Sequence, residues 1–202
     1  KKLLKSPYEV RRLKDLLEDI FCGQTVYGPR RTFASRGVPF ISAKVVTELG
    51  IDFSRNRQCI SRASVMFKPK SLVEPGDLVF VRVGVGCIGR AAVVTSNDEC
   101  GVVDDWCYVL RTRNGVSPYY LAFYLQSRYG KAQIEQLKRG VGTVTIPLRS
   151  LLEILVPLVP ERQNYRHMYL AMRRAFQAGL VDEARAIFCK ALQTIEKSLE
   201  PG

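Results

Sequence analysis

The sequence predicts an α+β fold, in which a mixed, mostly antiparallel β-sheet domain with flanking helices is followed by a C-terminal helical segment. Three observations lead to this prediction. Short β-prone runs divided by Gly, Pro and Asp occupy residues 38–112. A helical pattern starts at Ser117-Pro118, and residues 161–202 repeat apolar side chains at helical spacing. We therefore expect one domain over residues 1–160 and a helical spacer or dimerisation segment over residues 161–202.

The first part of the chain is expected to begin with a helix and continue with strands. Apolar residues fall on one helical face over residues 8–21, which predicts a short helix there. The run Val38–Ile41 is β-prone and predicts a strand. Residues 73–77, Val-Glu-Pro-Gly-Asp, form a strong turn signal. This turn is expected to open a strand over residues 78–83.

A glycine-rich turn follows that strand. Gly84, Gly86 and Gly89 complete a G-x-G-x-x-G pattern, which in dinucleotide-binding proteins precedes a helix whose N-terminus holds the pyrophosphate. Here Arg90 and the β-prone residues 91–95 follow instead. We therefore expect a β-hairpin whose turn can approach a phosphate backbone closely. A nucleotide-dependent enzyme that uses these glycines stays open as an alternative.

The second half of the predicted domain combines strands and helices. Residues 101–103 and 107–112 are further strand candidates. The helix that begins at Ser117 is expected to break near Gly130. Residues 138–145 form a basic, glycine-bearing loop. Such a loop is a second place where the backbone can approach a ligand closely.

The predicted tail is a helical hairpin or a kinked helix. A last β-like run lies within residues 151–158 and ends the domain. Gly179 interrupts the tail helix, and Asp182 is expected to cap its second stretch. The apolar stripe needs a partner surface, either the chain's own domain or a helix of another chain. The stripe residues that we assign to subunit contact are Met168, Met172, Phe176, Ile187 and Ile195.

Charge is the most unusual property of the composition. The chain has 31 Lys and Arg against 19 Asp and Glu, a net charge of +12. Such an excess favours polyanions, with nucleic acid first and an anionic membrane surface second, over a protein that is merely basic. No run of about 18 apolar residues is present, and the first residues lack a signal-peptide core. We expect a cytoplasmic protein.

Metal binding and catalysis are not expected. The six cysteines are scattered without a C-x-x-C pair, and His167 is the single histidine, which argues against zinc. Reduced thiols are favoured over a disulfide framework. The acid pairs Asp98-Glu99 and Asp104-Asp105 are assigned to turns. We therefore predict no catalytic residue, no metal and no cofactor.

Several segments form an ordered set. In chain order they are Leu13-Lys14-Asp15 with Gly23-Gln24-Thr25, residues 37–44, residues 73–82, residues 86–92, residues 120–131, and residues 140–148 followed by 155–158 and 161–163. Together they resemble the target recognition domain of Type I restriction–modification DNA specificity subunits (S subunits). No single motif is specific, but the order of the set is.

The resemblance implies a module that binds double-stranded DNA and reads one half of a split target. Methyltransferase (modification) subunits would be partners and would carry the chemistry, and a restriction subunit is left open. A whole S subunit carries two such domains separated by long helices, whereas this chain shows one and does not begin with Met. It could be a half-length subunit, a fragment, or the recognition domain of a fused type II restriction–methyltransferase enzyme. The tail could form a homodimer or serve as a protein-interaction scaffold.

Polar and basic side chains beside glycines and in loops are the candidate DNA contacts. Those that neighbour glycines or turns are assigned to phosphates: Arg82, Arg90, Lys131 and Arg139. Those in polar loops are assigned to base edges: Lys44, Arg55, Arg57, Arg62 and Thr143. The aromatic residues of the domain, Phe40, Phe80, Tyr108, Tyr120 and Tyr124, are expected in the core rather than as stacking platforms.

Overall fold

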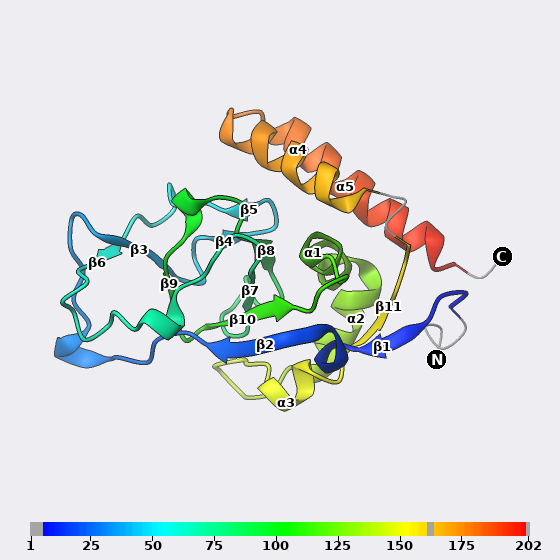
Figure 1. Ribbon diagram of the computed structural model, residues 1–202. Helices are drawn as coiled ribbons and strands as arrows, with labels where there is room; N and C mark the ends of the chain where they lie inside the picture. Colours follow the sequence, from blue (N-terminus) through cyan, green and yellow to red (C-terminus); the bar gives the residue numbers. More distant parts are fainter. Residues whose placement is uncertain (1–5, 161–163, 201–202) are drawn as a thin grey trace. The chain divides into compact units, whose positions relative to one another are not determined.

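The structure is a computed structural model that describes residues 6–160 and 164–200 (Figure 1). It divides into two compact units. The central unit is Asp19–Arg111, and the terminal unit is formed by the chain before Asp19 and after Arg111. The expected boundary at residue 160 does not coincide with this division, and the spacer role of residues 161–202 stays a prediction. Residues 161–163, the end of the resemblance, lie outside the described residues.

The central unit is built on short strands. Its largest sheet has the order β2-β10-β7-β8, beside a three-stranded sheet β6-β3-β9 and the pair β4-β5. The pairs β7–β8 and β7–β10 are antiparallel, whereas β3–β9 is parallel. The α+β prediction with a mixed, mostly antiparallel sheet is thus confirmed. The strands are β2 (Leu17–Cys22), β3 (Val38–Ile41), β4 (Val46–Thr47), β5 (Gly50–Ile51), β6 (Cys59–Ile60), β7 (Leu78–Val81), β8 (Ala91–Val93), β9 (Val102–Val103) and β10 (Cys107–Thr112). Short 3-10 helices lie at Gly28–Arg30, Pro69–Ser71 and Asn97–Glu99.

Strand β7 lies at the centre of this unit because every one of its residues is apolar. Val79 and Val81, two positions apart, point to the same face and join one apolar cluster with Ala92 and Val109. All four residues of the strand are buried, so both faces of the sheet are covered here. A smaller cluster forms around Phe40, Ile60, Met66 and Val102.

The terminal unit combines one strand pair with helices. Its elements are β1 (Val10–Arg12), the 3-10 helix Leu13–Leu16, α1 (Pro118–Gln126), α2 (Arg128–Leu137), α3 (Leu148–Leu151), β11 (Leu155–Pro157), α4 (Tyr165–Gln177) and α5 (Val181–Ser198). Strands β1 and β11 pair in antiparallel register, with Arg11 opposite Val156. As predicted, α1 begins after Ser117, whose side chain accepts a hydrogen bond from the Tyr120 backbone N–H.

The predicted helix over residues 8–21 is wrong. That segment forms β1, a 3-10 helix and the start of β2. The Leu13 backbone N–H donates to the Ile154 carbonyl at 2.8 Å, and Leu13 and Leu16 are 0% and 1% exposed. Pairing with β11 and burial of the two leucines therefore outweigh the helical spacing of the apolar residues.

The break between the middle helices lies at Ser127, not at Gly130 as predicted. The Ser127 side chain accepts from the Gly130 backbone N–H and donates to the Tyr124 carbonyl, which ends one helix and caps the next. Gly130 is instead a packing position inside α2. A Cβ at this residue would lie 2.3 Å from the Tyr124 carbonyl oxygen, so only glycine fits.

Helices α4 and α5 form the predicted helical hairpin, side by side in Figure 1. Gly179, at φ +81°, lies in the turn between them, as expected for a glycine that ends a helix. Asp182 does not cap α5, because the N-cap is Leu180 and Asp182 lies in the first helical turn. There its charge still favours the helix N-terminus.

Candidate nucleic-acid interface

The glycine turn joins β7 to β8 and makes the predicted hairpin. Gly84, Gly86 and Gly89 have φ values of +127°, +76° and +90°, which side chains rarely adopt. Strand β8 follows and pairs with β7, Phe80 facing Ala91. A strand rather than a helix follows the glycines, so this turn lacks the helix N-terminus of a dinucleotide cradle.

Three cationic side chains converge beside this turn. Lys44, Arg55 and Arg90 line an open pocket of about 630 Å³, together with Val85, Gly86 and Cys87 of the turn itself. The three residues come from different segments of the central unit, and no carboxylate belongs to the lining. Within residues 6–160 and 164–200, neither Lys44 nor Arg90 forms an ion pair. The pocket is thus a positively charged site that is open to an anion.

Arg55 is held in place by a partner on its own loop. Its Nε lies 3.2 Å from Asp52 Oδ2, and Asp52 also accepts from the Ser54 hydroxyl at 2.6 Å. The Arg55 side chain remains about half exposed, 52%. A guanidinium with one fixed hydrogen bond and further free N–H directions is suited to bind an oxyanion or a base edge.

Arg82 lies under the turn rather than in the pocket. Its Nε donates to the Asp105 carbonyl at 2.7 Å, and its guanidinium lies 5.1 Å from the centre of the Tyr108 ring. Its side chain thus contacts the β9–β10 turn and supports the shape of the hairpin end. Sequence alone gave no sign of this, because residue 105 is distant in the chain.

Two more predicted base readers lie outside the pocket. Arg57 is exposed, and Arg62 is exposed with its guanidinium 5.5 Å from the Phe67 ring centre. Arg62 also lines a separate pocket of about 540 Å³ with Glu74. The structure therefore brings together three of the six predicted contacts in the central unit.

The remaining candidates belong to the terminal unit. Lys131, Arg139 and Thr143 are exposed. Arg139 and Thr145 exchange two backbone hydrogen bonds of 2.9 Å, which close the loop between them. Gly140 has φ +104°, and a Cβ there would lie 2.6 Å from the Thr143 carbonyl oxygen. The predicted basic loop is thus a hairpin that is closed by backbone hydrogen bonds and requires glycine at residue 140.

Asp104, Asp105 and Glu99, from the two acid pairs, each have a partner among the described residues. Asp104 accepts from both terminal nitrogens of Arg31, at 3.2 and 3.1 Å, and Tyr27 donates its hydroxyl to Asp105. Glu99 accepts from the backbone and hydroxyl of Thr95. Among the described residues, no group of three His, Cys, Asp or Glu side chains could hold a metal ion.

The cysteines near the turn are poor nucleophiles. Burial raises the pKa of the Cys87 thiol and of the Cys22 thiol. Burial raises the pKa of Cys107 further, since that thiol lies completely in the core. These raised pKa values keep the thiols protonated near neutral pH, and because the thiolate is the reactive form, the thiols are poor nucleophiles. The core placement of the five aromatic residues Phe40, Phe80, Tyr108, Tyr120 and Tyr124 is confirmed, each at 5% exposure or less.

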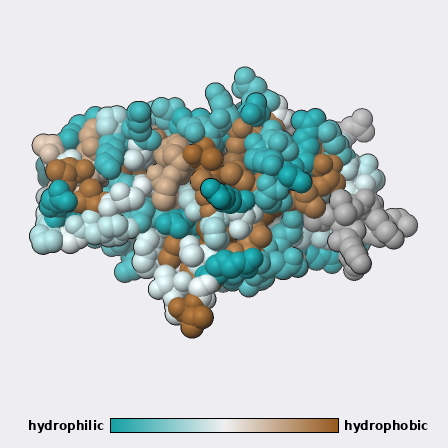
Figure 2. Space-filling view, turned by 90° about the horizontal axis from the view of Figure 1, so that it is seen from below, coloured by the Kyte–Doolittle hydropathy of each residue, from teal (hydrophilic) through white to brown (hydrophobic). Residues whose placement is uncertain are grey.

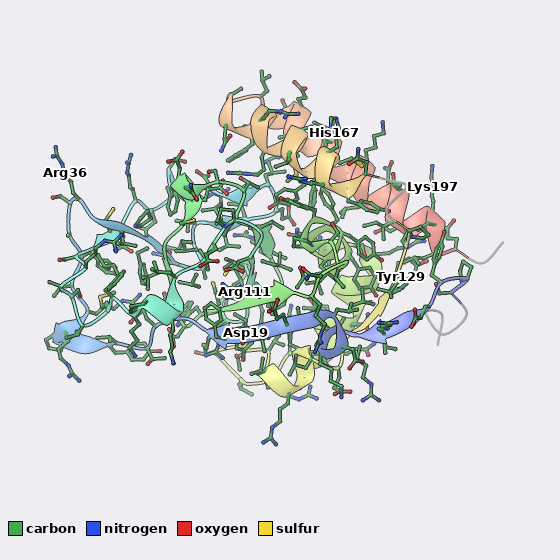
Figure 3. The ribbon with its side chains drawn as sticks, in the orientation of Figure 1. Asp19, Arg36, Arg111, Tyr129, His167 and Lys197 are labelled. Carbon is green, nitrogen blue, oxygen red and sulfur yellow. The ribbon has the colours of Figure 1, made fainter. Side chains whose placement is uncertain are left out.

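The predicted subunit-contact residues fall into two groups. Met172 and Ile195 are completely buried in the packing of the terminal unit. Met168, Phe176 and Ile187 are half-buried and are the members of the set with surface left for a partner. His167 is exposed on α4 (Figure 3).

Two exposed apolar residues at the glycine turn were missed. Val85 is 89% exposed between two glycines, and Trp106, the single tryptophan, is 44% exposed in the neighbouring β9–β10 turn. The Gly-Val-Gly pattern could have drawn attention to Val85, because a valine gains nothing from a solvent-exposed turn. No sequence signal places Trp106 beside it.

Comparison with known proteins places the fold. No family model and no curated protein matches the chain. A structure from the study "Structural basis underlying complex assembly and conformational transition of the type I R-M system" matches with a TM-score of 0.55 at 22% identity, covering 92% of this chain and 45% of that one. The HsdS subunit from Thermoanaerobacter tengcongensis matches with a TM-score of 0.56 at 18% identity. This match covers 95% of this chain and 44% of that one. The Type I restriction–modification S subunit from M. genitalium matches with a TM-score of 0.56 at 11% identity. This match covers 85% of this chain and 40% of that one.

The chain therefore has an S-subunit-like fold. It spans less than half the length of each of these three structures. None of the helices in the described part of the chain is long and apolar enough to cross a membrane.

Proposed function

We propose that this chain is a sequence-specific duplex DNA-binding module that reads one half of a split target for a restriction–modification complex. The observation that carries the proposal is the pocket at the glycine turn, where Lys44, Arg55 and Arg90 converge without a carboxylate in the lining. The net charge of +12 and the S-subunit-like fold support the same function.

The pocket suits the DNA backbone and the groove beside it. Gly86 lies in its wall, so a phosphate can approach the main chain without meeting a side chain. Arg90 is assigned to phosphates, and Lys44 and Arg55 to base edges, where arginine and lysine pair with the O6 and N7 acceptors of guanine. Arg82 has a positioning role in this arrangement, because it holds the turn through Asp105.

The other candidates are proposed as further DNA contacts, each within its own unit. Arg57 and Arg62 are proposed as further base contacts, and in the terminal unit Lys131 and Arg139 as phosphate contacts with Thr143 at a base edge. Each direct phosphate contact would add about 0.9 to the slope of log affinity against log salt. All five are exposed, and all but Thr143 are positively charged.

Catalysis belongs to partners in this proposal. Methyltransferase subunits would modify the target, a restriction subunit would join in the complete system, and the chain would need no cofactor of its own. The half-buried Met168, Phe176 and Ile187 of the helical hairpin are proposed to contact another helix, either of a methyltransferase subunit or of a second copy. The assembly would act in the cytoplasm.

Selection from a random duplex library tests the proposal. The chain, with a methyltransferase subunit present, should enrich a short, fixed base pattern. The variant Lys44→Gln/Arg55→Gln should lose the enrichment while its circular dichroism stays unchanged, since both side chains are exposed. Equal recovery of all sequences would contradict sequence-specific recognition.

A further inference from the structure

Two exposed apolar side chains lie at the glycine turn and at the turn beside it. Val85, which is 89% exposed, lines the same pocket as Lys44, Arg55 and Arg90. Trp106 is 44% exposed at the adjoining turn. Neither residue has a role in phosphate binding, so the proposed backbone contacts leave both unexplained.

The two turns are fastened to each other. The backbone N–H groups of Arg82 and Val83 both donate to the Trp106 carbonyl, at 2.9 and 3.4 Å. The Trp106 ring packs beside Gly84, where an added Cβ would lie 3.8 Å from ring atoms Cε3 and Cζ3. The Arg82 bond to the Asp105 carbonyl fixes the same corner. These hydrogen bonds fix the backbone of both turns, so less conformational entropy of the turns is lost when Val85 and Trp106 bind a ligand.

Exposure of an apolar residue is not by itself a signal on this protein. Figure 2 shows hydrophobic groups scattered among hydrophilic ones over one face. What distinguishes Val85 is its setting between two glycines with positive φ. The same setting recurs in the terminal unit, where Val141 stands fully exposed between Gly140 and Gly142 in the basic loop. The chain thus has two loops with a Gly-Val-Gly tip near cations.

We propose that Val85 and Trp106 contact the edges of thymine bases in the major groove of bound DNA. The inference rests on the proposed function and deepens it by naming a base. The C5-methyl of thymine is the apolar group that the major groove offers, so an apolar side chain held there by flanking phosphate contacts meets that methyl. Arg90 on the pocket wall supplies the flanking phosphate contact. Val85 and Trp106 then determine specificity at positions that the cations cannot distinguish.

The test replaces thymine by deoxyuridine, which lacks only the methyl group. A duplex selected by the chain is prepared with thymine or with deoxyuridine, and both are titrated against the 202-residue chain. We expect the wild-type chain to lose about fourfold in affinity for each contacted methyl, from the apolar transfer free energy of one such group. The Val85→Ala variant should bind the thymine duplex more weakly and respond less to deoxyuridine, as coupled partners do.

Controls separate this inference from the proposed function. Val65→Ala removes an equally small, 56% exposed apolar side chain from another turn of the central unit and should change neither affinity nor the deoxyuridine effect. Because the chain has one tryptophan, its fluorescence reports on Trp106 directly and should change when the duplex saturates the protein.

Two results would overturn the inference alone. One is steeply salt-dependent binding with an equal deoxyuridine effect in the wild type and in Val85→Ala. The other is loss of methyltransferase assembly in Val85→Ala with unchanged DNA affinity, which would make the tip a protein contact. Absence of binding to every duplex would remove the proposed function, and this inference with it.

Discussion

At the scale of single residues, the buried charges of the central unit have partners within the chain. Asp77 is 3% exposed and accepts from Arg111 Nε and Nη2, at 2.9 and 2.8 Å, and from the Glu74 backbone N–H. The hydrogen bond to Asp77 raises the pKa of the Arg111 guanidinium, labelled on β10 in Figure 3. Asp77 is the last residue of the turn predicted at residues 73–77. Its two-point ion pair with Arg111 could not be predicted from the sequence.

Replacement of Asp77 should destabilise the protein. In Asp77→Ala, Arg111 and the Glu74 N–H lose their acceptor, and we expect the free energy of unfolding to fall by about 1–3 kcal/mol, less than for a fully buried pair because Arg111 is about one-third exposed. Urea denaturation measures this. Arg11→Ala, which breaks the exposed pair with Glu9, should leave the midpoint unchanged. Equal midpoints for both variants would contradict the assignment.

Tyr165 should make the stability depend on alkaline pH. Burial raises the pKa of Tyr165 to about 12, and its hydroxyl has no partner within the described residues. The unfolded chain loses this proton near pH 10 and the folded chain near pH 12, so the folded state holds more protons between these values. The stabilisation is complete below about pH 10 and is lost as the pH rises to about 12, by about 1.4 kcal/mol per pH unit.

The Tyr165→Phe variant isolates this effect. It should be as stable as the wild type at pH 7, or slightly more stable, because it removes an unpaired buried hydroxyl. Its free energy of unfolding should fall less between pH 10 and 12. Chemical denaturation at several pH values measures both, and parallel curves for the two proteins would contradict the account.

At the scale of elements, strong local signals gave correct predictions. The strands around residues 38–41 and 107–112 and the start of α1 were predicted from β-prone runs and from Ser117-Pro118. Residues 8–21 were predicted incorrectly because β1 is determined by its pairing with β11, which lies far away in the sequence, at residues 155–157. Backbone hydrogen bonds over that separation leave no local pattern.

Gly130, inside α2, is a second position where the local sequence pattern did not predict the structure. A glycine in a helical pattern suggests a break, yet this one permits close contact with the Tyr124 carbonyl. We expect Gly130→Ala to lower the free energy of unfolding by about 1–3 kcal/mol through overpacking, although alanine favours helices. Ala132→Ser at an exposed position of α2 should change it by a few tenths of a kcal/mol. A more stable Gly130→Ala protein, seen in thermal unfolding, would show that α2 can move away from α1.

At the scale of the whole molecule, the resemblance carried by an ordered set of weak motifs predicted an S-subunit-like fold, which the solved structures share. The composition predicted a polyanion partner but not which cations act together. Lys44, Arg55 and Arg90 are brought to one pocket by tertiary structure, whereas Arg82 is turned toward Asp105. Val85 and Trp106 were missed because side-chain exposure at a turn depends on how neighbouring turns pack.

The salt dependence of duplex binding tests the central claim most directly. The variant Lys44→Gln/Arg55→Gln/Arg90→Gln is compared with Arg36→Gln/Lys68→Gln/Lys70→Gln, which removes three exposed cations from the same unit, so both lower the net charge of +12 equally. We predict that log affinity falls steeply with log salt for the wild type, and that the pocket variant binds more weakly and loses about 0.9 unit of slope, from the phosphate contact assigned to Arg90. The control variant should lose much less. Equal slopes for the two variants, or no salt dependence in the wild type, would contradict a DNA-binding pocket at the glycine turn.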